Sequence, residues 1–316
     1  MVSRRATVQN GVLGSSLSLA RSQLFFPFIP RSAGVSTVKN VVFHQAGKLR
    51  LKLDVYRPAQ RPQRAPVLIF VHGGAWMIGK KDHHGLYLMQ YLAAQGWVCF
   101  GVDYRLSPRA TFPDHLVDVK RAIAWVREHA AEHGGDPDFL IIAGGSAGGH
   151  LCSLAALTAH DRSYQPGFEQ ADTSVRGCVS LYGIYDFEDR ALVWPHHGLR
   201  QLLEKHVMKA RFAEHPELFE RASPIRRIEA DAPPFMVIHG DLDTMVPVDE
   251  GRHFTAAFRA VASAPICYAE IPGAQHAFEV FPSLRSALVF QGIARFGAWV
   301  HSRYLEEARV PALDAP

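Results

Sequence analysis

The sequence predicts an α/β protein in which helices cover both faces of a mainly parallel sheet. Short apolar runs bounded by glycine, proline or polar residues alternate with stretches of helical composition. The chain has 316 residues, of which 48% are hydrophobic and 20% charged, as is typical of a packed globular domain. The sequence shows neither a repeat nor a low-complexity tract. We therefore expect one sizeable globular domain.

Seven segments are expected to form strands. Residues 48–56, KLRLKLDVY, alternate leucine and valine with charged residues, as a half-exposed antiparallel strand does. Six apolar runs predict the buried strands of the parallel part: 67–71, 98–102, 139–143, 175–182, 235–238 and 266–271. Residues 187–230 are rich in His, Glu, Arg and Leu and carry no strand signal. They predict a helical insertion, which we expect to form a small cap over the functional site.

One serine stands where a strand is expected to turn into a helix. In FLIIAGGSAGGHLCSLAAL (139–157), Gly144 and Gly148 lie two positions either side of Ser146 and give the pattern G-x-S-x-G. Larger residues at those positions would clash in a turn tight enough to push the serine outward. The glycines do not form a nucleotide-binding pattern of the P-loop or dinucleotide type. The motif predicts a nucleophilic serine, although by itself it also fits a plain glycine-rich turn.

A nucleophilic serine needs a base, a group that orients the base, and donors for the oxyanion. The expected strand at 67–71 runs directly into His72-Gly73-Gly74-Ala75-Trp76. The backbone amides of Gly73 and Gly74 can approach a ligand closely, and with the amide of Ala147 they predict an oxyanion hole. A His-Gly-Gly sequence alone also fits a plain turn.

Candidates for the acid and the base follow two later strands. The expected strand at 235–238 ends in a loop with two carboxylates, Asp241 and Asp243. The one at 266–271 precedes a loop that carries His276. The chain order is therefore serine, acid, histidine, an order known from serine hydrolases.

The chain has 17 histidines, so His276 must be compared with the others. The pairs at 83–84 and 196–197 lack the companion ligands of a metal site, and we expect both pairs to be exposed to solvent. His72 and His239 each end a strand before a glycine, and we expect them to shape those loops. Only His276 combines a late loop with the expected chain order.

Together these motifs resemble an α/β-hydrolase of the hormone-sensitive-lipase-like esterase family over roughly residues 40 to 301. The matching residues are His72 to Trp76, Asp103 to Pro108, Gly144 to Gly148, Asp243 and His276. The resemblance implies the α/β-hydrolase fold and aligns Asp243, rather than Asp241, with the acid of the triad. The loop HGDLDTMVP is closer to related acetyl-esterase and peptidase-like hydrolases. The motifs therefore specify serine-hydrolase chemistry more closely than they specify a substrate.

We expect a carboxylesterase or lipase-like enzyme that cleaves short to medium acyl esters through an acyl-enzyme. Ser146 would attack the carbonyl, His276 would transfer the proton, and Asp243 would orient the imidazole. This chemistry requires no metal and no organic cofactor. An amidase or formamidase on the same scaffold is the nearer alternative, and a non-catalytic binding protein is the more distant one.

The N-terminal region has an unusual charge. Its first 53 residues contain no Asp or Glu but carry 8 Lys and Arg. We expect residues 1–39 to form a basic arm that either packs beside the cap or lies on an anionic membrane surface, and residues 40–316 to form the catalytic domain. The segment QLFFPFIP is too short to span a bilayer, which needs about 20 apolar residues. The basic residues are scattered and accompany no nucleic-acid-binding motif.

The four cysteines lie in apolar segments without regular spacing. We expect Cys99, Cys152, Cys178 and Cys267 to be buried thiols, which favours a reducing, cytoplasmic compartment. The expected partner is a small-molecule ester, and the sequence does not indicate an oligomeric state.

Overall fold

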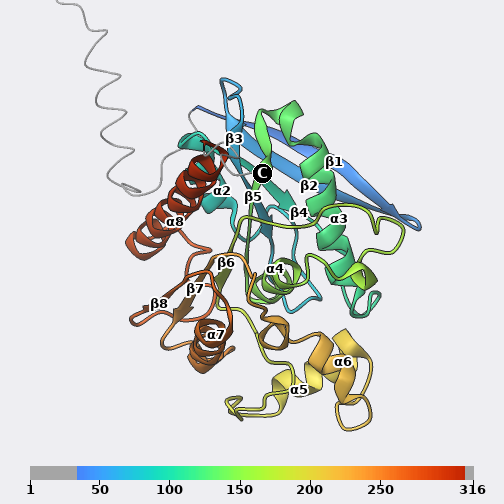
Figure 1. Ribbon diagram of the computed structural model, residues 1–316. Coiled ribbons are helices and arrows are strands. Elements are labelled where there is room, and N and C mark those ends of the chain that lie inside the picture. The colour runs from blue at the N-terminus through green and yellow to red at the C-terminus, as the bar shows by residue number, and fades with distance from the viewer. Residues whose placement is uncertain (1–33, 310–316) are drawn as a thin grey trace, which may run out of the picture.

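The computed structural model describes residues 34–309. They form one eight-stranded sheet with the order β1-β2-β4-β3-β5-β6-β7-β8 (Figure 1). The strands are β1 (Val35–Ala46), β2 (Leu49–Pro58), β3 (Ala65–Val71), β4 (Val98–Val102), β5 (Gly135–Gly145), β6 (Gly177–Leu181), β7 (Phe235–Gly240) and β8 (Ile266–Ile271). The α-helices are α2 (Leu86–Ala94), α3 (Asp114–His129), α4 (Ala147–Leu157), α5 (Gly198–Leu202), α6 (Pro216–Arg221), α7 (Val248–Val261) and α8 (Leu284–Arg309).

The sheet is parallel from β4 to β8, whereas β1 and β2 join it in antiparallel pairings. Parallel neighbours need crossover connections, and helices supply them between most of these strands. The carboxyl ends of the parallel strands therefore meet along one edge. Val71 at the end of β3 pairs with Gly144 at the end of β5, so the loops that follow these two strands begin side by side.

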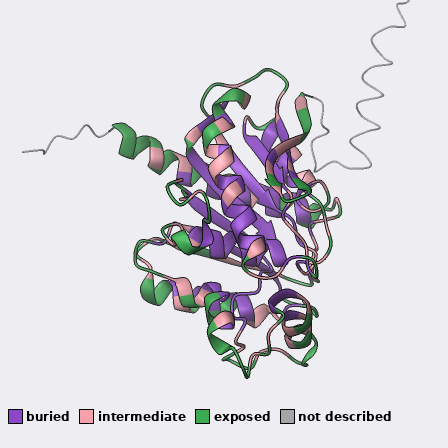
Figure 2. Ribbon diagram, turned by 90° about the vertical axis from the view of Figure 1, so that its right-hand side faces the viewer, coloured by how far each residue is buried: buried purple, intermediate pink, exposed green. Residues whose placement is uncertain are grey.

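Successive side chains of the central strands point to opposite faces of the sheet and pack into two separate hydrophobic cores. In β3, Val67 and Ile69 pack into the core beneath α3, α4 and α7, whereas Leu68 and Phe70 pack into the core beneath α2 and α8. All four side chains are buried. Helices thus cover both faces (Figure 1), and the central strands are buried (Figure 2). This confirms the expected α/β architecture.

The expected strands are all present, with differences in their bounds. Strand β5 extends over eleven residues, well beyond 139–143, and β1 was not expected at all. Strand β2 is antiparallel as expected, and Arg50 on its polar face is exposed, but the prediction of exposure is wrong for the second half of that face. Asp54 and Tyr56 on that face are buried because α2 packs against it. The Asp54 carboxylate is paired with the ammonium of Lys81 at 3.4 Å.

Residues 187–230 contain α5, a π-helical turn at Leu203–Met208, α6 and a 3₁₀ turn at Pro224–Arg227, and no strand. They lie at the lower end of the molecule in Figure 1, where Figure 2 shows much exposed surface. Within the predicted basic arm, strand β1 begins at Val35, and the rest of the arm lies outside the described residues. No helix between residues 34 and 309 combines the length and the apolarity that a bilayer crossing demands.

The four cysteines are free thiols. Three of them are buried as expected, but the prediction is wrong for Cys267, which is exposed. Cys267 lies on β8, the edge strand of the sheet, where one of the two faces is left partly uncovered. An apolar run on an edge strand does not guarantee burial of each of its side chains.

Candidate active site

The turn between β5 and α4 places Ser146 at the carboxyl edge of the sheet. Ser146 has a φ of 57°, a left-handed conformation that is uncommon for a residue with a side chain. The backbone packs so closely here that a methyl group on Gly148 would lie 2.0 Å from the carbonyl oxygen of Val71. One on Gly144 would lie 2.3 Å from the carbonyl oxygen of Gly148. At both glycine positions of G-x-S-x-G, a side chain would therefore clash with the backbone.

Three side chains from distant parts of the chain meet beside this turn. The Nε2 atom of His276 lies 2.9 Å from Ser146 Oγ, and its Nδ1 atom lies 2.7 Å from Asp243 Oδ2. Ser146 follows β5, Asp243 follows β7 and His276 follows β8, so the carboxyl ends of three strands in the same half of the sheet supply the three groups. Each distance is within hydrogen-bonding range. A proton can pass from the hydroxyl to an imidazole that a carboxylate orients.

Further hydrogen bonds fix the carboxylate of Asp243. Its Oδ1 atom accepts from the backbone amides of Met245 and Val246, both at 2.9 Å, and the Nε2 atom of His239 lies 3.4 Å from Oδ2. Burial disfavours the charge of Asp243, but the hydrogen bonds from His239 and His276 outweigh it and hold the pKa below its ordinary value. The carboxylate is therefore ionised and fixed in place.

Asp241, the other candidate acid, does not reach the histidine. Its Oδ1 atom accepts from the backbone amide of Gly273 at 2.7 Å and so ties the loop after β7 to the loop after β8. The structure brings Asp243 to His276 and leaves Asp241 at the surface.

The predicted oxyanion residues lie beside Ser146. Gly73 and Gly74 follow β3, and Gly73 borders the turn: a methyl group on Gly73 would lie 2.8 Å from the carbonyl oxygen of Gly145. Within residues 34–309, the amides of Gly73 and Gly74 donate no hydrogen bond to another residue. Ala147 is the first residue of α4, where the helix leaves its amides free for an outside acceptor. Three amides are thus available near the serine.

Two histidines behave as loop-shaping residues, as expected. His72 is buried, stacks on the ring of Tyr104 at 4.4 Å between centroids, and places Nδ1 2.8 Å from the carbonyl oxygen of Gly73. Burial lowers the pKa of His72 to about 4, so this imidazole is neutral. His239 lies 2.9 Å from the carbonyl oxygen of Val246. The sequence did not indicate that His239 would also lie close to Asp243.

His84 is a neighbour of the site that sequence reasoning missed. The prediction of exposure is correct for His83 and the pair at 196–197, but wrong for His84, which is half-buried. A methyl group on Gly73 would lie 2.9 Å from its Nδ1 atom, so the imidazole packs against the oxyanion loop. Burial lowers the pKa of His84, and the charge of His276 lowers it further. The run KKDHHG carries no signal for this contact.

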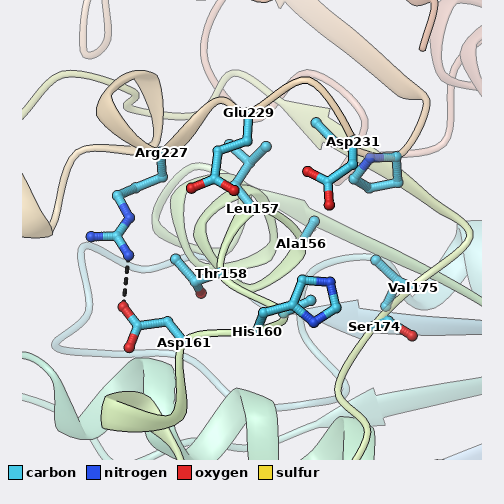
Figure 3. A pocket seen from close by; sticks show the side chains of 13 residues that line it. Ala156, Leu157, Thr158, His160, Asp161, Ser174, Val175, Arg227, Glu229 and Asp231 are labelled. Carbon is cyan, nitrogen blue, oxygen red and sulfur yellow. Dashed lines mark hydrogen bonds and ion pairs between the residues drawn. The ribbon is translucent and has the colours of Figure 1, made fainter. Parts of the chain in front are cut away.

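A hollow lies at the carboxyl end of α4, the end opposite Ser146 (Figure 3). It has a volume of about 300 Å³ and is lined by the carboxyl end of α4, the residues before β6, and the segment 227–233. Arg227 and Asp161 form an ion pair of 2.6 Å at its wall. An eleven-residue helix is about 16 Å long, so this hollow is remote from Ser146 and plays no part in the site.

A parallel sheet of this order, a serine in a strained strand-to-helix turn, and a hydrogen-bonded Ser, Asp, His series in that chain order define an α/β-hydrolase. The fold prediction from the motifs is confirmed. The BD-FAE family model matches residues 53–258, and the chain belongs to this family.

Named relatives agree with this assignment. The chain is 44% identical over 276 residues to "Esterase LipQ" of Mycobacterium tuberculosis, covering 87% of this chain and 65% of that protein. It is 48% identical over 255 residues to "Probable carboxylic ester hydrolase LipM" of the same organism, covering 79% of this chain and 58% of LipM. The chain therefore spans less than two thirds of the length of either relative.

The fold is also close to that of a solved structure. A propionate-bound esterase, Est2 of Thermogutta terrifontis, superimposes with a TM-score of 0.67 at 26% identity. The match covers 90% of this chain and 98% of that one. The likeness thus extends over almost the whole of the smaller protein.

Proposed function

We propose that the protein hydrolyses carboxylic esters through an acyl-enzyme intermediate. The observation that carries this proposal is the hydrogen-bonded series from Ser146 Oγ through the His276 imidazole to the Asp243 carboxylate, with distances of 2.9 and 2.7 Å. Such a series activates a hydroxyl that is otherwise a poor nucleophile. The esterase names of LipQ and LipM support the same reaction class.

In the first half-reaction, Ser146 Oγ attacks the carbonyl carbon while its proton moves to His276 Nε2. The carboxylate of Asp243 keeps the proton of the imidazole on Nδ1 and stabilises the imidazolium that forms. The imidazolium then protonates the leaving alcohol, which gives the acyl-enzyme. In the second half-reaction, water gives up a proton to His276 and attacks the acyl carbon. The bond between that carbon and Ser146 Oγ then breaks, the imidazolium returns the proton to Oγ, and the carboxylic acid is released. No metal or organic cofactor takes part.

The oxyanion that forms in each half-reaction needs fixed donors. We assign this role to the amides of Gly73, Gly74 and Ala147: Gly73 borders the serine turn, Ala147 directly follows Ser146, and the amides of Gly73 and Gly74 have no acceptor in the described residues. Donors that are already in place stabilise charge that develops only in the transition state. Loss of one such donor typically costs about 10²-fold to 10³-fold in kcat.

The acyl group is proposed to be short to medium in length. The solved structure of the Thermogutta esterase has propionate bound, and this chain has the same fold. We propose that residues 187–230 form the cap that limits the pocket, because this segment consists of helices outside the sheet. The cap would then determine which acyl chains fit.

A matched panel tests the proposal. p-Nitrophenyl esters of two to twelve carbons and the corresponding anilides are assayed with the purified protein and with Ser146→Ala. We expect ester hydrolysis, and a loss of roughly four to six orders of magnitude in Ser146→Ala. Faster turnover of the anilides would favour an amidase. If folded Ser146→Ala retained a tenth of the activity, the serine mechanism would be wrong.

The cellular location and the partners are also proposals. We propose a cytoplasmic protein whose basic arm, residues 1–39, either contacts an anionic membrane or packs beside the cap; most of this arm lies outside the described residues. Attraction to anionic lipid is worth about 1 kcal/mol per basic residue near the surface. Cosedimentation with anionic vesicles, before and after deletion of residues 1–38, separates these two roles.

A further inference from the structure

A buried tyrosine and a buried glutamate contact each other beside the proposed base. Tyr182 follows β6 and Glu279 follows His276 by three positions; Tyr182 has no exposed surface and Glu279 is 3% exposed. The hydroxyl of Tyr182 donates a short hydrogen bond to Glu279 Oε1. Burial raises the pKa of both groups, which shows how little water reaches this pair. The mechanism proposed above uses neither residue.

The tyrosine contacts both the base and the serine turn. Its ring lies edge-to-face against the imidazole of His276, with 4.6 Å between centroids and an angle of 61°. A methyl group on Gly145 would lie 2.6 Å from the Tyr182 hydroxyl, so this hydroxyl borders the residue before Ser146. One side chain therefore touches the proposed base and the residue that precedes the proposed nucleophile.

The backbone fixes Tyr182 in an unusual conformation. Its φ is 39°, a region that an aromatic residue rarely adopts, and its amide donates to the carbonyl oxygen of Ile238 on β7 at 2.7 Å. Backbone strain of this kind is concentrated at functional sites. Here the conformation directs the ring toward His276 from a residue anchored to the sheet.

The loop that carries His276 is held on one side by the loop after β7, through hydrogen bonds that include the one from the amide of Gly273 to Asp241 Oδ1. It runs from the end of β8 to the start of α8, and its backbone bonds to the rest of the fold include the amide of Leu242 donating to the carbonyl oxygen of Ala274. Glu279 attaches the far side of this loop to Tyr182. Its Oε2 atom has no partner among residues 34–309, so the tyrosine is the side chain that holds this carboxyl group.

We infer that Tyr182 and Glu279 act as a positioning pair that holds the His276 imidazole against Ser146. Burial of a carboxyl group costs free energy unless its hydrogen bonds are made, so an apolar contact would hold the loop at lower cost. The pair instead provides a directional bond, which sets the loop relative to the serine turn. Displacement of a reacting group by about 1 Å can cost 10²-fold in rate. This inference rests on the proposed serine mechanism.

The test compares Tyr182→Phe with Tyr185→Phe. Tyr185 is also fully buried, and its hydroxyl donates to Ser180 Oγ at 2.7 Å without touching the triad. Each variant therefore loses one buried tyrosine hydroxyl. We expect Tyr182→Phe to lower kcat for a short ester at least about tenfold more than Tyr185→Phe does, with KM changed less than about twofold.

Glu279 variants test the pair itself. Glu279→Ala is expected to lower kcat about as much as Tyr182→Phe, and the double variant to lower it no further, because one bond has been removed in each case. Glu279→Gln keeps an acceptor oxygen and should recover part of the loss. If Glu279→Ala does not fold, the comparison of the two tyrosine variants and Glu279→Gln remains decisive.

Two results would overturn the inference: a kcat for Tyr182→Phe no lower than that of Tyr185→Phe, or losses that multiply in the double variant. Ser146→Ala distinguishes this failure from failure of the proposed function. If Ser146→Ala is inactive while Tyr182→Phe resembles its control, the serine mechanism stands and only the positioning pair is rejected.

Discussion

The turn at Ser146 and the helical segment 187–230 are attached to the sheet in different ways. At the turn, segments of backbone pack directly against one another, so that a methyl group on Gly148 or Gly144 would not fit. The helical segment is attached by separate hydrogen bonds, such as that from the amide of Phe112 to the carbonyl oxygen of Val207. Side chains supply others: Trp194 Nε1 donates to Glu250 Oε1 at 2.6 Å, and the guanidinium of Arg227 donates to Asp161 Oδ2 at 2.6 Å.

This difference separates the chemistry from the selection of substrate. Backbone contacts at the turn fix the reacting atoms and exclude any larger residue there. Side-chain anchors in the helical segment can change one at a time, since the triad touches none of them in the described residues. Substitutions at the strand ends should therefore affect turnover, whereas those in the helical segment should affect stability and substrate range.

The largest effect is expected at the strand ends. Asp243→Asn should lower kcat on the order of 10⁴-fold, because the imidazole of His276 would lose the acceptor that keeps its proton on Nδ1. Asp241→Asn is the matched control, since it keeps an oxygen for the amide of Gly273. Steady-state kinetics on one short ester measures both. The reverse ranking would assign the acid to Asp241.

The side chain of Glu250 contacts the helical segment 187–230, and its titration should make the free energy of unfolding depend on pH. Its Oε2 atom accepts from the amides of Tyr185 and Asp186, and burial raises its pKa to about 7. A carboxyl group with a raised pKa holds its proton longer in the folded state. Its contribution to stability is present below its unfolded pKa of about 4.5 and is lost as pH rises through 7.

Urea unfolding at pH 4.5 and pH 8 measures this contribution. Across that interval, Glu250 should lower the free energy of unfolding of the wild type by up to about 3 kcal/mol relative to Glu250→Gln, which cannot titrate. The difference between the two proteins isolates Glu250 from other groups that titrate in this range. Parallel pH profiles for the wild type and the variant would refute the assignment.

A smaller effect is expected from the anchor on the helical segment. Trp194→Phe removes the donor to Glu250 Oε1 but keeps an aromatic ring, over which Arg200 lies at 5.0 Å. We expect KM to change about threefold to tenfold for long acyl esters, with kcat for the shortest ester nearly unchanged. Trp299→Phe, on the partly exposed face of α8, controls for the loss of an indole. An equal fall in kcat for acyl esters of every chain length would contradict the separation of turnover from substrate range.

The sequence predicted the features that depend on local backbone geometry. Gly144, Gly148 and the pair after β3 are constrained by contacts with nearby strand ends, so their spacing identifies the turn. The strands of the parallel sheet were also recognisable because both of their faces are apolar. The longest apolar run of strand β1 is only three residues, 41–43, which is too short to indicate a strand.

The contacts that could not be predicted are made by side chains far apart in the chain. His84 packs on the oxyanion loop, Tyr182 meets Glu279 across 97 residues, and Glu250 meets Trp194 across 56. A single His, Tyr or Glu has no pattern around it that specifies such a partner. Burial of Cys267 was predicted wrongly for a related reason, because the position of β8 at the sheet edge follows from the complete fold.

The order of the strands has a consequence for how the protein is made. From β5 onward, each new strand joins the same edge of the sheet in chain order, and His276 follows Ser146 by 130 residues. A ribosome adds about 5 to 20 residues each second, so roughly 7 to 26 s separate the synthesis of the serine from that of the histidine. A nascent chain thus carries its nucleophile without a base, and hydrolysis can begin only when β8 and the loop after it have been added.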